Sequence, residues 1–296
     1  ETRFLMKYAL FLGCTIPARS RNYELASRKV AERLGLTFVD LESFICCGFP
    51  VRSASIDSST LLGAYNLALA QKQGLDVCTL CSSCTSALTE TAHRLDHDES
   101  ARETVNRDLD RLGLRYEGGT RVRHFARVLF EEIGKDEIAR QVQKPLDGLR
   151  IAAHYGCHYL KPSEIYDGFD DPENPRTLDE LVALTGAVPV HYKDKKRCCG
   201  GPVLPVDEGT SMAVAREKLE DIKAAGADAL TLVCPFCSVM YDSNQKGIES
   251  AYETEYGLPV LYLPQVLGIA MGFDRKELGL NMNVVKTKKL LARFYD

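Results

Sequence analysis

Ten of the eleven cysteines in this 296-residue chain form two sets of five with the same order. Each set begins with a Gly-Cys pair, continues with Cys-Cys-Gly and ends with Cys-x-x-Cys. The first set is Cys14, Cys46, Cys47, Cys81 and Cys84, and the second is Cys157, Cys198, Cys199, Cys234 and Cys237. Two matching sets predict two metal centres of one kind in a duplicated domain. Cys78 remains, and we expect it to be a buried free thiol, although Cys78-x-x-Cys81 is an alternative pairing.

Cysteine thiolates are soft ligands that select zinc, copper(I) or iron–sulfur clusters. Structural zinc takes four ligands in a tetrahedron, and a cubane [4Fe–4S] cluster also takes four cysteines. Five thiols per half are therefore one too many for either. Adjacent cysteines such as Cys46 and Cys47 diverge along a strand, which suits neighbouring atoms of a larger cluster. The alternatives are one buried bystander cysteine per set, or zinc held by four of five.

Disulfides are a further alternative, but disulfide frameworks are typical of short secreted chains with poor cores. This chain is long, and its start resembles a signal peptide only faintly, with Arg3 and Lys7 before a short apolar run over 8–12. We interpret that run as the first strand, with Met6 as the native start. These features favour a reducing cytoplasm.

Composition indicates a soluble globular protein, with 45% hydrophobic and 26% charged residues. The net charge of −4 gives no electrostatic case for nucleic acid. A membrane-spanning helix needs about 20 apolar residues. The longest candidate, residues 259–273, is shorter and is interrupted by Pro264. It predicts a buried strand followed by a helix, and we expect no transmembrane segment.

The elements around the cysteines alternate between short apolar runs and helical patterns. Apolar runs end at Gly13-Cys14 and Gly156-Cys157, as strands that enter a turn do. Helical patterns cover 22–34, 60–73, 176–186 and 209–225. This alternation predicts an α/β fold with mainly parallel strands. We expect a first domain over 1–90, a helical connector over 91–147, a second domain over 148–273 and a tail over 274–296.

The cysteines fall where strands end and helices begin. A helix amino terminus carries free N–H groups and a partial positive charge, both of which favour thiolates and anionic clusters. The neighbouring glycines and prolines predict tight turns around the sulfurs; they are Gly48, Gly200, Gly201, Pro50 and Pro202.

These motifs resemble the CCG-domain family, and within it the group formed by the B subunits of heterodisulfide reductases. The resemblance rests on both Cys-Cys-Gly sites and on residues 6–14, 154–162 and 261–268. It covers nearly the whole chain. Two complete cysteine sets make it far more specific than a lone Cys-Cys-Gly or Cys-x-x-Cys match would be.

The resemblance implies two similar domains with a pseudo-twofold relation, each holding one noncubane [4Fe–4S] cluster through its five cysteines. It implies that the two clusters face a shared cleft and reductively cleave a disulfide of the CoM-S-S-CoB type to two thiols. The implied partners are the C subunit, which is a ferredoxin-like iron–sulfur protein, and through it the flavin-carrying A subunit. The sequence has no Gly-x-Gly-x-x-Gly loop, so we expect flavin and nicotinamide to bind elsewhere.

Several other polar residues are candidates for roles near the cysteines. His154, His158 and Lys161 are the predicted catalytic residues. The two histidines flank Cys157 and could donate a proton to a leaving thiolate or a hydrogen bond to cluster sulfur, or could simply be structural. Lys161 could neutralise an anionic substrate, as could Arg19, Arg52 or Arg197. We expect His124 to pack or to cap a helix.

Two other functions stay open at this point. Within the family, the same clusters could serve a sulfur-oxidising complex or one linked to succinate or quinone. Outside it, the cysteines could hold zinc in a module that only binds partners. Acid-labile sulfide and visible absorbance separate this last alternative from the others.

Overall fold

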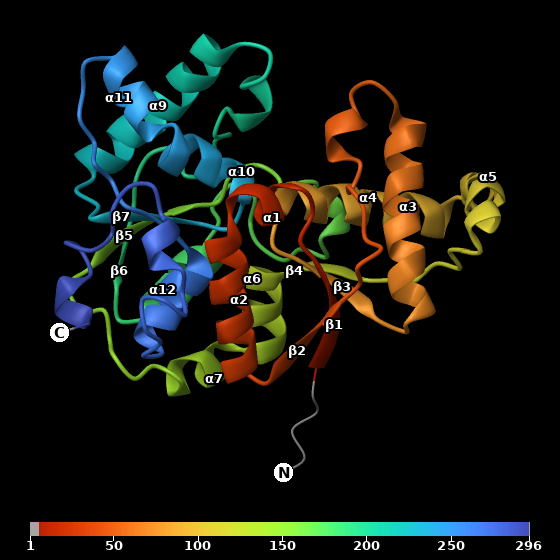
Figure 1. Ribbon diagram of the computed structural model, residues 1–296, viewed down its shortest axis with the longest axis horizontal. Coiled ribbons are helices and arrows are strands. Elements are labelled where there is room, and N and C mark those ends of the chain that lie inside the picture. The colour runs from red at the N-terminus through yellow and green to blue at the C-terminus, as the bar shows by residue number, and fades with distance from the viewer. Residues whose placement is uncertain (1–5, 296) are drawn as a thin grey trace.

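The computed structural model describes residues 6–295 and has two similar halves lying side by side (Figure 1). Arg3 of the signal-like motif lies outside the described residues. Each half contains a four-stranded sheet, ordered β2-β1-β3-β4 in the first and β6-β5-β7-β8 in the second, with all pairs parallel. The strands are β1 (Met6–Phe11), β2 (Leu36–Asp40), β3 (Asp76–Thr79), β4 (Val122–His124), β5 (Arg150–His154), β6 (Val188–Val190), β7 (Ala229–Leu232) and β8 (Val260–Tyr262).

Helices connect these strands in both halves. In the first half they are α1 (Thr15–Arg19), α2 (Arg21–Arg33), α3 (Ile56–Lys72), α4 (Ser82–His97), α5 (Glu99–Leu109), α6 (Phe125–Arg127) and α7 (Lys135–Arg140). In the second half they are α8 (Thr177–Ala183), α9 (Glu208–Ala224), α10 (Pro235–Ser238), α11 (Gln245–Ala251) and α12 (Leu263–Ala270). Two π-helical segments, over 128–133 and 239–243, continue α6 and α10.

The predicted α/β fold with a duplicated domain is therefore confirmed. The four helical patterns correspond to α2, α3, α8 and α9, and residues 259–273 form β8 and α12. The central strands are apolar runs because helices cover both faces of each parallel sheet. All four residues of β7 and the last four of β1 are buried.

The segment over 91–147 differs from the helical connector that the sequence predicts. It contains helices α5–α7, but it also contains β4, which pairs with β3 and completes the first sheet, with Val122 opposite Val77. A strand of three residues is too short for its periodicity to be visible in a sequence.

The carboxyl-terminal segment over 274–295 packs against both halves. Asn283 is 1% exposed and donates a hydrogen bond to the Val260 carbonyl at 2.6 Å. Its amide oxygen accepts from Asn22 of α2 and from Gln265 of α12. This part of the predicted tail is thus integral to the fold rather than a solvated end.

Side chains from both halves meet at the junction, where α2 contacts α12 and α1 contacts α10. Tyr23 stacks on Tyr262 with 4.0 Å between the ring centroids. The Tyr23 hydroxyl donates to the Val233 carbonyl at 3.2 Å, and His124 Nε2 lies 2.9 Å from the same oxygen. His124 Nδ1 also accepts from the backbone of Ala126, so His124 caps α6 as predicted.

None of the helices within residues 6–295 combines the length and apolar character that crossing a membrane requires.

Candidate metal centres and the adjoining cleft

The carboxyl ends of the strands place both cysteine sets at corresponding edges of the two sheets. Cys14 follows β1 and is the N-cap of α1. Cys81 follows β3 and is the N-cap of α4, just as Cys234 follows β7 and is the N-cap of α10. None of these three caps uses its side chain, so each thiol is free for another partner. The predicted position of the cysteines between strands and helices is correct.

The Cys-Cys-Gly turns fold tightly against the helices that follow them. Gly48 has φ +88° and Gly200 has φ +82°, which side-chain-bearing residues rarely adopt. A Cβ atom at Gly48 would lie 2.6 Å from the Ser59 carbonyl oxygen, and one at Gly200 would lie 2.7 Å from that of Ser211. The glycine therefore allows the preceding cysteines to approach the helix, in both halves alike.

Thiols of the first set contact one another through Cys47. Hydrogen bonds with Cys46 and then Cys84 lower the pKa of the Cys47 thiol to about 4. Cys84 in turn contacts Cys81. Cys14 is exposed, lies 3.7 Å from the Thr15 hydroxyl and acts on Cys46 electrostatically.

The second set forms the equivalent network. Hydrogen bonds with Cys157 and then Cys199 lower the pKa of the Cys198 thiol to about 2. Cys199 contacts Cys237, which contacts Cys234. The backbone N–H groups of Gly200 and Gly201 point at the Cys198 and Cys199 sulfurs, each at 3.4 Å.

The two networks meet, because Cys81 and Cys234 contact each other across the junction. Hydrogen bonds from Cys237 and Cys81 hold the pKa of Cys234 well below its usual range. All eleven cysteines are free thiols, which contradicts the disulfide alternative. Cys78 is fully buried in β3, where burial raises the pKa of its thiol, as expected for a core residue.

The donor set fits an iron–sulfur cluster in each half. Thiolates are the ligands that such clusters take, and backbone N–H groups directed at the sulfurs offset their negative charge. Within the described part of the chain, no three His, Cys, Asp or Glu side chains are arranged around a site for a single metal ion.

A cavity of about 1060 Å³ is lined by residues of both halves. Phe49 and Pro50, which follow the first Cys-Cys-Gly, line it together with Pro202 and Pro205, which follow the second. The middle residues of the Cys-x-x-Cys pairs, Ser83 and Phe236, line this cavity and also contact smaller hollows beside the cysteines of both sets. We call this cavity the cleft; residues next to cysteines of both sets line it, and the cysteines themselves line the two smaller hollows.

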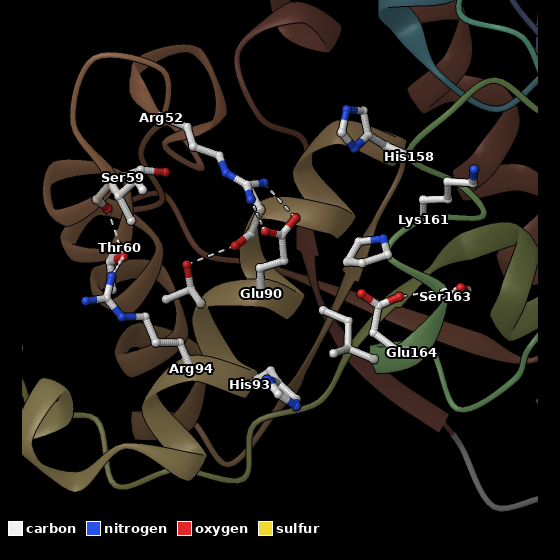
Figure 2. A pocket seen from close by; sticks show the side chains of 15 residues that line it. Arg52, Ser59, Thr60, Glu90, His93, Arg94, His158, Lys161, Ser163 and Glu164 are labelled. Atoms are coloured by element: carbon white, nitrogen blue, oxygen red, sulfur yellow. Dashed lines mark hydrogen bonds and ion pairs between the residues drawn. The ribbon is translucent and has the colours of Figure 1, made fainter.

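A second cavity of about 900 Å³ opens beside the cleft and shares Arg52, Ile56 and His158 with it. Figure 2 shows Arg52 reaching toward Glu90, with His158 and Lys161 on the opposite side. The two terminal guanidinium nitrogens of Arg52 pair with the Glu90 carboxylate. We call this second cavity the polar pocket.

His158 is oriented by a chain of hydrogen bonds. The Ser86 hydroxyl donates to Glu90 at 2.7 Å, so its oxygen is left to accept from His158 Nδ1, which lies 3.1 Å away. The ring packs edge-on against Phe49 with 4.8 Å between centroids. Burial lowers the pKa of His158. Neither Ser86 nor Glu90 is recognisable as a site residue from the sequence, where their only signal is their spacing of one helical turn in α4.

The other predicted residues are distributed unevenly around the site. His154 is 1% exposed, and its Nε2 lies 3.3 Å from the Cys237 sulfur, behind the second cysteine set. Lys161 lines the polar pocket. Arg197 pairs with Glu217, and Arg19 ends α1 and lines neither the cleft nor the polar pocket.

Comparisons with known proteins agree with this architecture. The sequence profile of the CCG family, described as a cysteine-rich domain, matches residues 8–89 and 151–242. The chain is 35% identical to the B subunit of the ferredoxin/F420H2-dependent CoB-CoM heterodisulfide reductase of Methanosarcina acetivorans, over 99% of this chain and 98% of that protein. It is 30% identical to the 8-methylmenaquinol:fumarate reductase membrane anchor subunit of Wolinella succinogenes, over 96% and 99% of the two chains. A crystal structure of a hypothetical protein from Helicobacter pylori shares the fold, with a TM-score of 0.76 and 19% sequence identity. The match covers 95% of this chain and 52% of that protein.

Proposed function

The chain belongs to the CCG family of cysteine-rich domain proteins, and from this premise we propose that it is the catalytic B subunit of a heterodisulfide reductase-type complex. In this role it is an oxidoreductase that cleaves a disulfide of the CoM-S-S-CoB type into two thiols. The observation that carries the proposal is that residues next to cysteines of both sets, among them Pro50, Ser83, Pro202 and Phe236, line one cleft. Each half offers a separate place for one sulfur of the disulfide.

Two noncubane [4Fe–4S] clusters would be held by the five cysteines of each set. When bound, they supply the two electrons that disulfide cleavage requires and iron sites for the two sulfurs. The protein contributes the shape of the cleft. Phe49 and Phe236 give it apolar walls, and Pro50 and Pro202 belong to the turns that follow the Cys-Cys-Gly motifs. A disulfide held between these walls has both sulfurs positioned before reaction, which turns an encounter into a fixed geometry.

Cleavage also requires protons for the two thiol products, and we assign one of them to His158. Its Nδ1–H is engaged with Ser86, so Nε2 is the ring atom left to hold and deliver a proton. The residue lines both the cleft and the polar pocket. His154 is buried against Cys237, and we assign it to a hydrogen bond with cluster sulfur rather than to proton delivery.

The polar pocket extends the cleft on one side and would take a substrate arm. Arg52 and Arg94 are already paired with Glu90 and Asp57, so the Lys161 amine is the cation of this pocket that we assign to an anionic substrate group. The expected partners are the ferredoxin-like C subunit and, through it, the flavin-carrying A subunit, in a reducing cytoplasm.

A second candidate function has one specific observation in its favour. The relative from Wolinella succinogenes bears the name of a menaquinol:fumarate reductase subunit and matches the chain over almost its full length. The same two clusters could accordingly pass electrons between a quinone pool and a partner enzyme.

Elemental analysis and turnover together test the proposal. Protein purified without oxygen should contain about eight iron atoms and eight acid-labile sulfides per chain, the content of two [4Fe–4S] clusters. The reconstituted complex should reduce the mixed disulfide faster than it reduces quinones or lipoyl disulfides. Zinc without sulfide would reject the cluster assignment, and preferential turnover of a quinone would favour the second candidate.

A further inference from the structure

The duplication allows each residue near one cysteine set to be compared with its counterpart near the other. Gly48 and Gly200 make the same close approach to Ser59 and Ser211. Seven residues after these serines come Asn66 in α3 and Lys218 in α9, which are therefore equivalent positions. By the same comparison at the Gly-Cys pairs, Phe11 in β1 is equivalent to His154 in β5.

Lys218 places a cation inside the second half. It is 2% exposed, and its amine donates to the backbone carbonyls of Asp194 at 2.6 Å and Arg197 at 2.9 Å. Arg197 directly precedes Cys198 and Cys199, so the amine lies beneath their turn. Burial lowers the pKa of Lys218 to about 8, against opposing attraction from Cys237 and Cys199, and the amine stays largely protonated near pH 7.

Asn66 performs the same structural task in the first half without a charge. It is fully buried, and its amide nitrogen donates to the Cys46 carbonyl at 3.2 Å while its oxygen accepts from Ile45 at 2.9 Å. Both side chains therefore fasten the turn that carries the adjacent cysteines. An amide is sufficient for this task, so the buried charge of Lys218 needs a different explanation.

A second difference between the halves lies in the β-strands, and it too favours negative charge near the second cysteine set. His154 Nε2 lies 3.3 Å from the Cys237 sulfur, while His154 Nδ1 has no hydrogen-bond partner. A thiolate can only accept, so the ring N–H belongs on Nε2, which also leaves a lone pair rather than a donor unpaired on Nδ1. In the first half the equivalent residue, Phe11, offers no N–H group.

Two arginines near the sets are paired with carboxylates. Arg52, close to the first set, pairs with Glu90, and Arg197, close to the second, pairs with Glu217. Lys218 and His154 are the buried cation and the buried N–H group that the second half has where the first half has Asn66 and Phe11.

Resting on the proposed presence of a cluster in each half, we infer that the second-half site has the higher reduction potential, and that Lys218 and His154 set the difference. Reduction adds negative charge to a cluster. A buried cation and an N–H group directed at a ligand sulfur both stabilise that charge, and the low dielectric of the interior strengthens the effect. An electron that reaches the pair therefore resides on the second-half site, which makes the two halves functionally unequal despite their common fold.

Lys218→Asn, which installs the first-half residue, tests this inference by anaerobic redox titration followed by electron paramagnetic resonance. Variants Cys47→Ser and Cys199→Ser, each removing a ligand from one half, assign the signals. We expect Lys218→Asn to lower the ratio of reduced to oxidised second-half site at least ten-fold at a fixed potential, equivalent to about 59 mV for a one-electron couple. The first-half midpoint should stay in place, and Lys218→Arg should restore the second.

Lys223→Asn is the matched control, because it removes the same charge from the same helix at an exposed position, where the amine donates to the Glu255 carbonyl and lies over the Tyr256 ring. If Lys218→Asn fails to fold, His154→Phe provides the test instead, because it should also lower the midpoint potential of the second-half site. Three outcomes would overturn this inference while leaving the proposed function intact. They are full clusters with unchanged midpoint potentials, equal shifts of the midpoint potential in both halves, and no rescue by Lys218→Arg. Wild-type protein without iron or sulfide would instead overturn the proposed function.

Discussion

A histidine can deliver a proton in a defined direction only if its other ring nitrogen is held, and here Ser86 holds it. The Ser86 hydroxyl donates to Glu90, whose carboxylate is in turn fixed by Arg52. This fixes which nitrogen of His158 faces the cleft. The arrangement links a residue beside the second cysteine set to α4 of the first half, so both halves contribute to one proton donor.

We expect His158→Gln to lower turnover of the disulfide by about 10²-fold, the lower end of what a positioned proton donor contributes. Glutamine can still hydrogen-bond to Ser86, but it cannot carry a proton. Iron and sulfide contents should match the wild type, which separates a proton-transfer defect from cluster loss. His97→Gln, at an exposed position near the end of α4, should turn over normally. Unchanged turnover in His158→Gln would remove the residue from the mechanism.

Single residues differ in how far the sequence predicts them. The cysteines are predictable because duplication repeats their types and order, and chance rarely repeats five positions. Ser86, Glu90 and Lys218 are not, because a serine, a glutamate or a lysine on a helix is most often solvated. Lys218 becomes conspicuous only once the structure shows it buried.

Among the structural elements, the Cys-Cys-Gly turn imposes the strictest demand on sequence. Its positive φ and its contact with the next helix are separate constraints, and the chain offers a way to separate them. Gly74 also has positive φ, at +65°, but a Cβ there would meet no atom within 4 Å. Gly48 has a positive φ too, but a Cβ there would also collide with the Ser59 carbonyl oxygen.

Gly74→Ala should lower the free energy of unfolding by about 1 kcal/mol, the cost of the left-handed backbone alone. Gly48→Ala should lower it by about 3 kcal/mol, because the methyl group also collides with backbone that cannot rotate away. Chemical denaturation measures both values. Gly48→Ala should additionally reduce the iron content, since Cys46 and Cys47 move with the turn. Equal destabilisation by the two substitutions would show that the helix contact carries no energy.

Element order was predictable from alternating strand and helix patterns, but β4 was not. Only Val122 of its three residues is apolar, and its pairing with β3 depends on contacts distant in sequence. The equivalent β8 was visible because the apolar α12 follows it directly. The local pattern therefore identified strands that are themselves apolar, such as β8, and missed β4, which has a single apolar residue.

At the scale of the whole molecule, the two halves are joined by apolar stacking and by a few buried hydrogen bonds. The Val233 carbonyl, one residue before Cys234, accepts from Tyr23 and His124 of the first half. These bonds fix the strand end that carries Cys234 next to Cys81. The sequence predicted two domains, but it carried no signal for this joint, because the partners are more than a hundred residues apart.

The junction also predicts a pH dependence of stability. His124 is 2% exposed, and burial lowers its pKa to about 4, so the folded protein holds it neutral while the unfolded chain binds a proton below about pH 6.5. The stabilisation is therefore complete above pH 6.5 and is lost as the pH falls toward 4, by roughly 3 kcal/mol in total.

His124→Gln keeps a donor for the Val233 carbonyl but cannot titrate. We expect the difference in free energy of unfolding between wild type and His124→Gln to be constant above pH 6.5 and to decrease steadily below it, measured by denaturant titration from pH 5 to 7.5. Other titrating groups cancel in this difference because both proteins share them. A difference that stays flat across the whole range would show that His124 is protonated as easily in the fold as in water, and would refute this account of its burial and of its hydrogen bond to Ala126.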